Sequence, residues 1–124
     1  MGYESKLYIV EKGYPNREGG KRYASIIGMF DMCKFYDLAA FMCSAPETDC
    51  YIYAEDGNTQ ILEDRYGAPL TEASVKDVIG VLAKVLKSGN NYRRIKPALM
   101  FLKCIQYQIE QGMWREVVVL HFGH

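Results

Sequence analysis

The last segment of the chain, residues 116–122, is almost wholly apolar. Its apolar residues are Val117, Val118, Val119, Leu120 and Phe122. A strand with one face in water alternates apolar and polar side chains, so this continuous run predicts an interior strand that is covered on both faces or nearly so. The chain therefore has to build a sheet with other elements packed over it.

The chain has 124 residues, of which 49% are hydrophobic. This length is sufficient for one real core, so we expect residues 1–124 to form a single compact domain. No run of about 18 consecutive apolar residues is present, and charged residues occur where a secretory signal places its apolar stretch. These features favour a cytoplasmic protein that does not enter the membrane.

The first half of the chain predicts a hairpin followed by a short helix. Residues 3–11 and 23–30 are β-favouring runs that flank a stretch of turn residues with an exposed loop. Asp31 is a candidate N-cap for a helix that has to end before Pro46. The predicted buried face of this helix consists of Phe35, Leu38, Ala39 and Met42.

A second hairpin is predicted from residues 50–54 and 59–64. The connecting residues Glu55–Asn58 contain the Asp-Gly pair that is typical of tight turns. Thr71 is a candidate N-cap for the next helix, and Gly89 can close it. One apolar stripe along this helix is formed by Val75, Val78, Ile79, Leu82, Val85 and Leu86.

The pair Asn90-Asn91 interrupts this pattern, and a third helix follows, with Pro97 in its first turn and Gly112 at its end. Its apolar positions are Ile95, Leu99, Leu102, Ile105 and Ile109. The predicted order is thus β-β-α-β-β-α-α-β. This order predicts an α+β fold with an antiparallel or mixed sheet and helices packed on one face.

The four cysteines lack the close CxxC pairing of zinc sites and redox motifs. They are Cys33, Cys43, Cys50 and Cys104. Because they lie mostly inside apolar periodic segments, we expect reduced thiols in the core rather than disulfides or metal ligands. No cofactor is expected.

Charged residues are separated along the chain, although 15 basic and 15 acidic residues give a net charge of zero. Residues 47–64 contain no Lys or Arg but carry Glu47, Asp49, Glu55, Asp56, Glu63 and Asp64. Residues 84–103 contain no acid but carry Lys84, Lys87, Arg93, Arg94, Lys96 and Lys103. Opposed surfaces of this kind create local potentials that can steer a charged partner.

The basic residues before and within the third helix form one candidate site. Tyr92, Arg93, Arg94 and Lys96 combine a stackable ring with cations and with the free N–H groups of a helix start, a combination that can hold phosphates. A small nucleic-acid-binding domain is therefore an alternative function. The same cluster can also be a solvated helix face that pairs with the acidic hairpin.

A metal site is a further hypothesis, and it ranks last. His121 and His124 are the two histidines, but a strand places residues three apart on opposite faces, so joint ligation requires a bend at Gly123. The acids of residues 49–64 offer oxygen ligands for Mg²⁺, without the positioned Lys that a nuclease site needs. A small metal-dependent hydrolase would combine His121 with these acids.

Three segments of the chain resemble small, mostly uncharacterised accessory proteins of phages and mobile elements in Gram-positive bacteria. They are residues 2–8 (GYESKLY), 49–59 (DCYIYAEDGNT) and 119–124 (VLHFGH). The resemblance spans most of the chain, and its motifs have no established chemistry. It implies a protein of the host bacterial cytoplasm that blocks a defence enzyme by binding, as anti-CRISPR proteins do.

The first hypothesis is thus a non-enzymatic interaction protein, a phage-type inhibitor that binds a basic, nucleic-acid-handling enzyme. A strand pair that displays carboxylates and tyrosines offers both charge and anchoring area. The candidate partner-binding residues are Asp49, Tyr51, Tyr53, Glu55, Asp56, Glu63 and Asp64. The hypothesis requires that these carboxylates are not neutralised by the protein's own cations.

Overall fold

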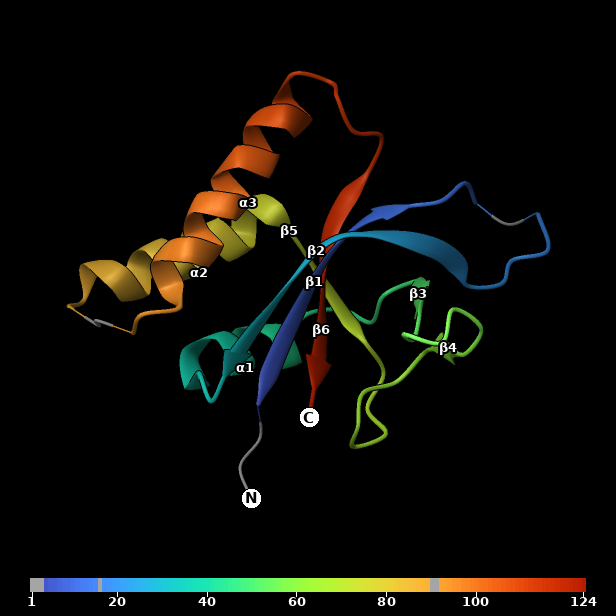
Figure 1. The fold of residues 1–124 in the computed structure, drawn as a ribbon, viewed down its shortest axis with the longest axis horizontal. Coiled ribbons are helices and arrows are strands. Elements are labelled where there is room, and N and C mark those ends of the chain that lie inside the picture. Colours follow the sequence, from blue (N-terminus) through green and yellow to red (C-terminus); the bar gives the residue numbers. More distant parts are fainter. Residues whose placement is uncertain (1–3, 16, 90–91) are drawn as a thin grey trace.

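The computed structural model describes residues 4–15, 17–89 and 92–124. Within these residues the chain has an α+β fold, as its sequence predicts (Figure 1). The elements are β1 (Ser5–Lys12), β2 (Arg22–Cys33), α1 (Tyr36–Cys43), β3 (Cys50–Tyr53), β4 (Gln60–Ile61), β5 (Thr71–Ser74), α2 (Val75–Lys87), α3 (Ile95–Glu110) and β6 (Val117–Gly123). The predicted strand start at Tyr3 and the predicted break at Asn90 and Asn91 lie outside the described residues.

The described strands form one mixed sheet in the order β4-β3-β2-β1-β6-β5. Strands β2 and β3 run parallel, and the other neighbouring pairs are antiparallel. Strand β6 lies between β1 and β5, so the prediction of an interior strand from its apolar sequence is confirmed. Figure 1 shows β1, β2 and β6 side by side at the centre of the molecule.

All three helices contribute to one large core on a single face of the sheet, the helix-side core. Helices α2 and α3 pack against each other, and all three helices lie to the left of the central strands in Figure 1. The buried strand residues of this core are Leu7, Ile9, Met32 and Val119. Among the described residues, no helix is long and apolar enough to cross a bilayer.

A smaller core, the strand-side core, fills the other face where the sheet curls. It is formed by Val10, Ala24, Cys50, Ile52, Leu70 and Leu120. Neighbouring residues of β6 therefore face different cores, with Val119 in the helix-side core and Leu120 in the strand-side core. This arrangement explains why the segment is continuously apolar rather than alternating.

The predicted N-cap at Thr71 is wrong, because Thr71 lies in a strand that the sequence does not predict. Strand β5 pairs with β6 from Thr71↔His121 to Ser74↔Val118. Ser74 then caps α2, since its extended backbone lets its hydroxyl accept a hydrogen bond from the N–H of Asp77 (3.0 Å). Pairing with an apolar interior strand outweighs the capping propensity of Thr71.

The predicted N-cap at Asp31 is also wrong. Strand β2 continues to Cys33, and Oδ1 of Asp31 accepts a hydrogen bond from the N–H of Cys33 (2.9 Å). Helix α1 begins later, at Tyr36, and Phe35 precedes it in an extended conformation without a side-chain cap. Strand β2 pairs with β1 as far as Ser5↔Cys33. This pairing extends β2 past Asp31, where the capping signal in the sequence predicts its end.

The turn and helix-end predictions agree with the structure. Gly57 has a φ of 75° in the turn between β3 and β4, a left-handed conformation that glycine adopts without strain. Gly89 and Gly112 have φ values of 90° and 73° just beyond the ends of α2 and α3. Pro97 is the third residue of α3, where no preceding turn requires its missing N–H.

The cysteine prediction is confirmed in one part and wrong in another. None of the four cysteines forms a disulfide, but only Cys50 is buried, whereas Cys43 and Cys104 are exposed. Burial, together with a hydrogen bond to Asp49, raises the pKa of the Cys50 thiol to about 11. Cys43 and Cys104 lie at exposed positions of α1 and α3, which apolar periodicity alone does not distinguish from core positions.

Alkylation is expected to separate these thiols. At about pH 8, a pKa of about 11 leaves very little of Cys50 as the reactive thiolate, and the thiol is buried, so Cys50 should react with iodoacetamide about a hundredfold or more slower than the exposed Cys104. Peptide mapping by mass spectrometry measures the rates. In denaturant all cysteines should react alike, and equal rates in the folded protein would contradict the structure.

Candidate functional site

A buried cation, Lys12, organises the first part of the acidic segment. Its side chain is only 7% exposed at the end of β1. Its Nζ lies 2.8 Å from Oδ1 of Asp49, 2.9 Å from Oε1 of Glu72 and 3.7 Å from Oε2 of Glu116. Burial by itself lowers the pKa of Lys12, but hydrogen bonds to Asp49 and Glu72 outweigh this effect and hold the pKa above its usual value. The ammonium therefore joins β1 to three segments that lie far away in the sequence.

Arg22 is a second internal partner of Asp49. Its Nε lies 2.9 Å from Oδ2 of Asp49, its Nη2 lies 3.4 Å from Glu116, and its Nη1 donates to the C=O of Gly13 (3.2 Å). Although partial burial works in the opposite direction, hydrogen bonds from Lys12 and Arg22 lower the pKa of Asp49 to about 2. Asp49 is thus an internal counter-ion, and not the free carboxylate that its position in the acidic segment suggests.

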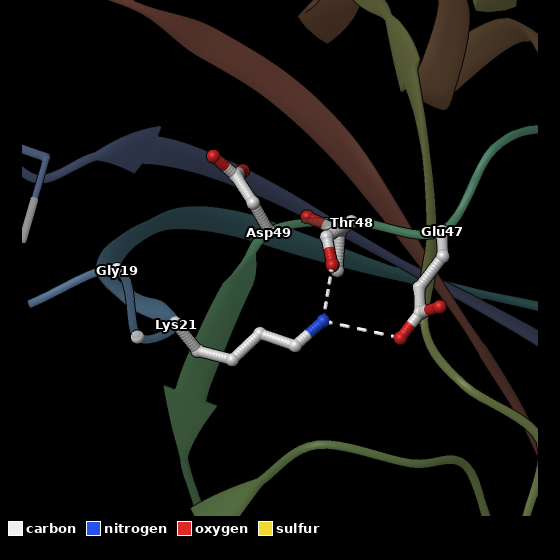
Figure 2. Close-up of a pocket in the computed structure, with 6 residues that line it drawn as sticks. Gly19, Lys21, Glu47, Thr48 and Asp49 are labelled. Carbon is white, nitrogen blue, oxygen red and sulfur yellow. Dashed lines mark hydrogen bonds and ion pairs between the residues drawn. The ribbon is translucent and has the colours of Figure 1, made fainter.

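Glu47 is neutralised in the same region, at the pocket shown in Figure 2. This pocket of about 490 Å³ is lined by residues 19–21 and 47–49. Nζ of Lys21 crosses it to contact Oε1 of Glu47 (3.2 Å) and the C=O of Thr48 (2.6 Å), whereas the carboxylate of Asp49 points away from Lys21. These contacts attach the loop between β1 and β2 to the segment before β3, so the pocket serves the architecture of the fold.

Asp56 in the β3–β4 turn and Asp64 in the loop after β4 have a different environment. Asp56 accepts hydrogen bonds from the N–H groups of Asn58 and Thr59 (both 2.9 Å), and its pKa is lowered by its bonds to Thr59 and Asn58. Asp64 likewise accepts from the N–H groups of Tyr66 (2.8 Å) and Ala68 (3.0 Å). Neutral amides fix these carboxylates in position but leave their negative charge in place.

Glu55 and Glu63 are exposed, and neither forms an ion pair with a described residue. With Asp56 and Asp64 they give four carboxylates between residues 55 and 64 that no described Lys or Arg pairs with. We call these four residues the hairpin acids. The sequence prediction of an uncompensated acidic surface therefore applies to this part of the segment, while Glu47 and Asp49 are paired internally.

Three tyrosines lie together on one face of β2 and β3, and two of them come just before the β3–β4 turn that carries Glu55 and Asp56. The ring of Tyr23 lies 5.9 Å from that of Tyr51 and 5.3 Å from that of Tyr53, and the rings of Tyr51 and Tyr53 are 5.5 Å apart. A hydrogen bond with Tyr53 raises the pKa of Tyr51. Sequence reasoning identified Tyr51 and Tyr53 but missed Tyr23, because the parallel register Tyr23↔Tyr51 leaves no local signal.

The basic cluster is partly used inside the protein. The ring of Tyr92 stacks on Phe35 at 5.0 Å, and its hydroxyl donates to the C=O of Met32. Arg94 donates from Nη1 to the C=O of Asp31 (2.6 Å). These two side chains attach the start of α3 to the end of β2, while Arg93 and Lys96 are exposed. Nucleic-acid binding by this cluster stays a prediction. A base would have to stack on the ring of Tyr92, which already stacks on Phe35.

The two histidines have separate surroundings. His121 is buried, its Nε2 lies 3.0 Å from Oγ of Ser5, and burial lowers its pKa. His124 has Nδ1 at 3.9 Å from Glu4 and Nε2 at 3.9 Å from Asp31. Among residues 4–15, 17–89 and 92–124, no group of three or more His, Cys, Asp or Glu side chains is placed to hold a metal ion. The hydrolase hypothesis therefore finds no supporting cluster there.

Comparisons with known protein families, with curated proteins and with solved structures gave no match to this chain. Inferences about its function therefore depend on the α+β fold and on the side chains described above.

Acid is expected to weaken the folded state through Asp49. Its pKa is about 2 in the folded protein and 3.8 in an unstructured chain, so between these values the unfolded state binds the proton more readily. The stabilisation by Asp49 is thus present above about pH 4 and is lost as the pH falls towards about 2. Urea unfolding at several pH values measures the free energy of unfolding of wild type and of Asp49→Asn. The difference between the two should shrink as the pH falls through this window. A difference that does not change with pH would contradict a lowered pKa of Asp49 in the folded protein.

Proposed function

We propose that this chain is a non-enzymatic interaction protein that binds a basic surface of a nucleic-acid-handling enzyme through the hairpin acids and the adjacent tyrosines, and inhibits that enzyme by occupation. The observation that carries the proposal is the contrast within one acidic segment. Asp49 is paired with Lys12 and Arg22, whereas the hairpin acids have no cationic partner among the described residues. A surface that keeps charge uncompensated is available to an external cation.

The hairpin acids are also suited to binding by their rigidity. Asp56 and Asp64 are held by the amides of their own turns, so little conformational freedom is lost when a partner contacts them. Carboxylates fixed on a ribbon can take the place of backbone phosphates on a cationic surface, because both present charged oxygen acceptors to Arg and Lys.

The tyrosines supply what the carboxylates lack, which is contact area. Tyr23 is 44% exposed, and Tyr51 and Tyr53 are half-buried beside it. Tyrosine is enriched at the centres of interfaces, where a rigid ring buries a large surface and its hydroxyl finds a polar partner. Charge on the hairpin and rings beside it therefore form a surface with both steering and anchoring groups.

The proposal is tested by capturing partners from nuclease-treated bacterial lysate with the immobilised protein and with two variants. Glu55→Gln/Glu63→Gln removes two hairpin acids whose side chains form no hydrogen bond with the residues that the structure describes. Asp37→Asn/Glu110→Gln removes the same charge from exposed positions on α1 and α3. We expect a nucleic-acid-handling enzyme to be captured by wild type and by the helix variant, and to bind the hairpin variant about tenfold more weakly.

The captured enzyme is then assayed with increasing amounts of the purified protein. Inhibition by wild type, and about tenfold weaker inhibition by the hairpin variant, would support the proposal. Capture that is equal for wild type and the hairpin variant, or a captured partner whose activity is unchanged, would argue against it.

A further inference from the structure

The long strand β2 has one side that is largely open. It pairs with β1 from Ala24 to Cys33, but its pairing with β3 is limited to Arg22 and Tyr23. Among the described residues, no other strand lies along this side of β2. Figure 1 shows β3 well away from the part of β2 that leads to α1. An unpaired strand edge presents N–H and C=O groups that another extended chain can use.

Met29 directs its backbone N–H and C=O groups towards this open side. The C=O of Asp31 points there, since it accepts a hydrogen bond from the side chain of Arg94 at the start of α3. Residues of an antiparallel strand face alternate sides, and the pairing is regular from Gly28 to Asp31, between the two register shifts. Met29 therefore faces the same side as Asp31, while Gly28 and Phe30 face β1.

A pocket of about 420 Å³ lies between this edge and the start of α3. Met29, Phe30 and Pro97 supply apolar surface to it, and Arg93 and Arg94 supply charge. The side chain of Met29 is 49% exposed. A strand edge with a helix beside it is the arrangement in which an extended peptide adds to a sheet while one of its side chains enters the neighbouring pocket.

The charge of this pocket indicates the chemistry of its occupant. Arg93 is exposed, and Arg94 is held in place by the C=O of Asp31. The carboxylate of Asp31 is also part of the lining and accepts a hydrogen bond from the N–H of Cys33. Two guanidinium groups against one carboxylate leave an excess of positive charge. An acidic side chain is complementary to that excess, and guanidinium groups bind carboxylates in a bidentate geometry.

We propose that the open edge of β2 binds an extended acidic peptide segment of a partner protein, which adds to the sheet as a further strand. Main-chain hydrogen bonds to Met29 position the segment, an apolar side chain occupies the pocket beside Pro97, and a neighbouring Asp or Glu pairs with Arg93. This surface lies on other residues than the hairpin acids and has the opposite charge. It is therefore a second binding site that does not depend on the first.

The probe for this site is a fluorescein-labelled peptide of about seven residues that alternates valine and glutamate, a length matched to the open edge. Fluorescence anisotropy should show binding with a Kd below about 1 mM. Arg93→Gln should weaken binding about fivefold or more, whereas Lys76→Gln, the same charge change on the exposed face of α2, should leave it unchanged. A peptide with alternate backbone nitrogens methylated should not bind, because it cannot add as a strand.

Amide hydrogen exchange of Met29 provides a direct test of the geometry. In the free protein the Met29 amide should exchange much faster than those of Gly28 and Phe30, and the peptide should slow it about tenfold or more. Met29→Pro removes this donor without removing a bond to β1, so it should fold and should not bind the peptide. If this variant fails to fold, Arg93→Gln still decides the proposal.

Three results would overturn the proposal. They are a lack of binding up to about 1 mM peptide, equal binding of the methylated peptide, and a Met29 amide that is already protected in the free protein. Protection that rises with protein concentration would mean that a second copy of this chain occupies the edge instead. The Glu55→Gln/Glu63→Gln variant should bind the peptide as wild type does, so a failure of either proposal can be recognised separately.

Discussion

Lys12→Met is expected to lower the free energy of unfolding by about 2–4 kcal/mol. The substitution keeps the buried stem but removes the ammonium that Asp49, Glu72 and Glu116 share. Arg22 still pairs with Asp49 and Glu116, but Glu72, whose side chain is only 20% exposed, is left beside them without an ion pair among the described residues. Because Asp49 and Glu116 are about half exposed, water screens part of the repulsion, which places the expected cost at the lower part of the range for broken buried ion pairs. Urea unfolding measures the change.

The control for this substitution is Lys76→Met, on an exposed position of α2, which should change stability by less than about 0.5 kcal/mol. A second check uses Glu72→Gln as the background. Removing one of the crowded carboxylates should make Lys12→Met less costly there than in wild type. Equal unfolding midpoints for Lys12→Met and wild type would show that the ammonium does not hold these segments together.

Gly28→Val is expected to lower the free energy of unfolding by about 1–3 kcal/mol, as overpacking of a core does. A Cβ atom at Gly28 would lie 2.7 Å from Cζ and 3.1 Å from Cε1 of Phe101. The ring of Phe101 also packs edge-on against Phe30, with centroids 5.3 Å apart, so it cannot retreat without opening the contact between α3 and the sheet. Urea unfolding is again the measurement.

The matched control is Ser25→Val, which adds the same side chain at an exposed position of β2 and should be close to neutral. In a Phe101→Ala background the clash is absent, so Gly28→Val should then be neutral or stabilising. An unchanged cost in that background would mean that the strand backbone, and not the ring of Phe101, requires a glycine.

Elements with a strong pattern of their own could be predicted from the sequence. Helix α2 has an apolar stripe, including Val78 and Leu82, that matches its buried face. Strand β6 was predictable as interior because both of its faces are apolar, and the β3–β4 turn was predictable because Gly57 takes a left-handed φ. In each case the signal lies within a few residues of the structure that it specifies.

Elements that depend on a distant neighbour could not be predicted in this way. The sequence Thr-Glu-Ala-Ser of β5 has little strand preference, and it is extended because β6 offers an unpaired edge. The cap at Asp31 failed for a similar reason, since pairing with β1 prolongs β2 to Cys33. Local capping signals are weaker than a complete ladder of backbone hydrogen bonds.

The candidate site shows the same division. The separation of charge along the chain was visible in the sequence, but the partners of Asp49 are Lys12 and Arg22, on two earlier strands. Asp49 is close to the hairpin acids in the sequence, so the sequence predicts that it belongs to the same acidic surface. In the fold it differs from them, because Lys12 and Arg22 neutralise it. Tyr23 joins Tyr51 and Tyr53 only through the parallel register of β2 and β3, which no local pattern encodes.

The central position of β1 has a consequence for how the chain reaches its native state. Strand β1 pairs with β6 over the stretch Ser5↔Gly123 to Glu11↔Val117, so its neighbours come from opposite parts of the polypeptide. Such non-local pairing makes loop closure entropically costly and is typical of domains that fold in milliseconds to seconds rather than microseconds. On the ribosome, Leu7 and Ile9 stay without β6 until residues 117–123 have been synthesised. The sheet around β1 should therefore be completed only after β6 has been synthesised, and a nascent chain exposes this edge of β1 in the interval.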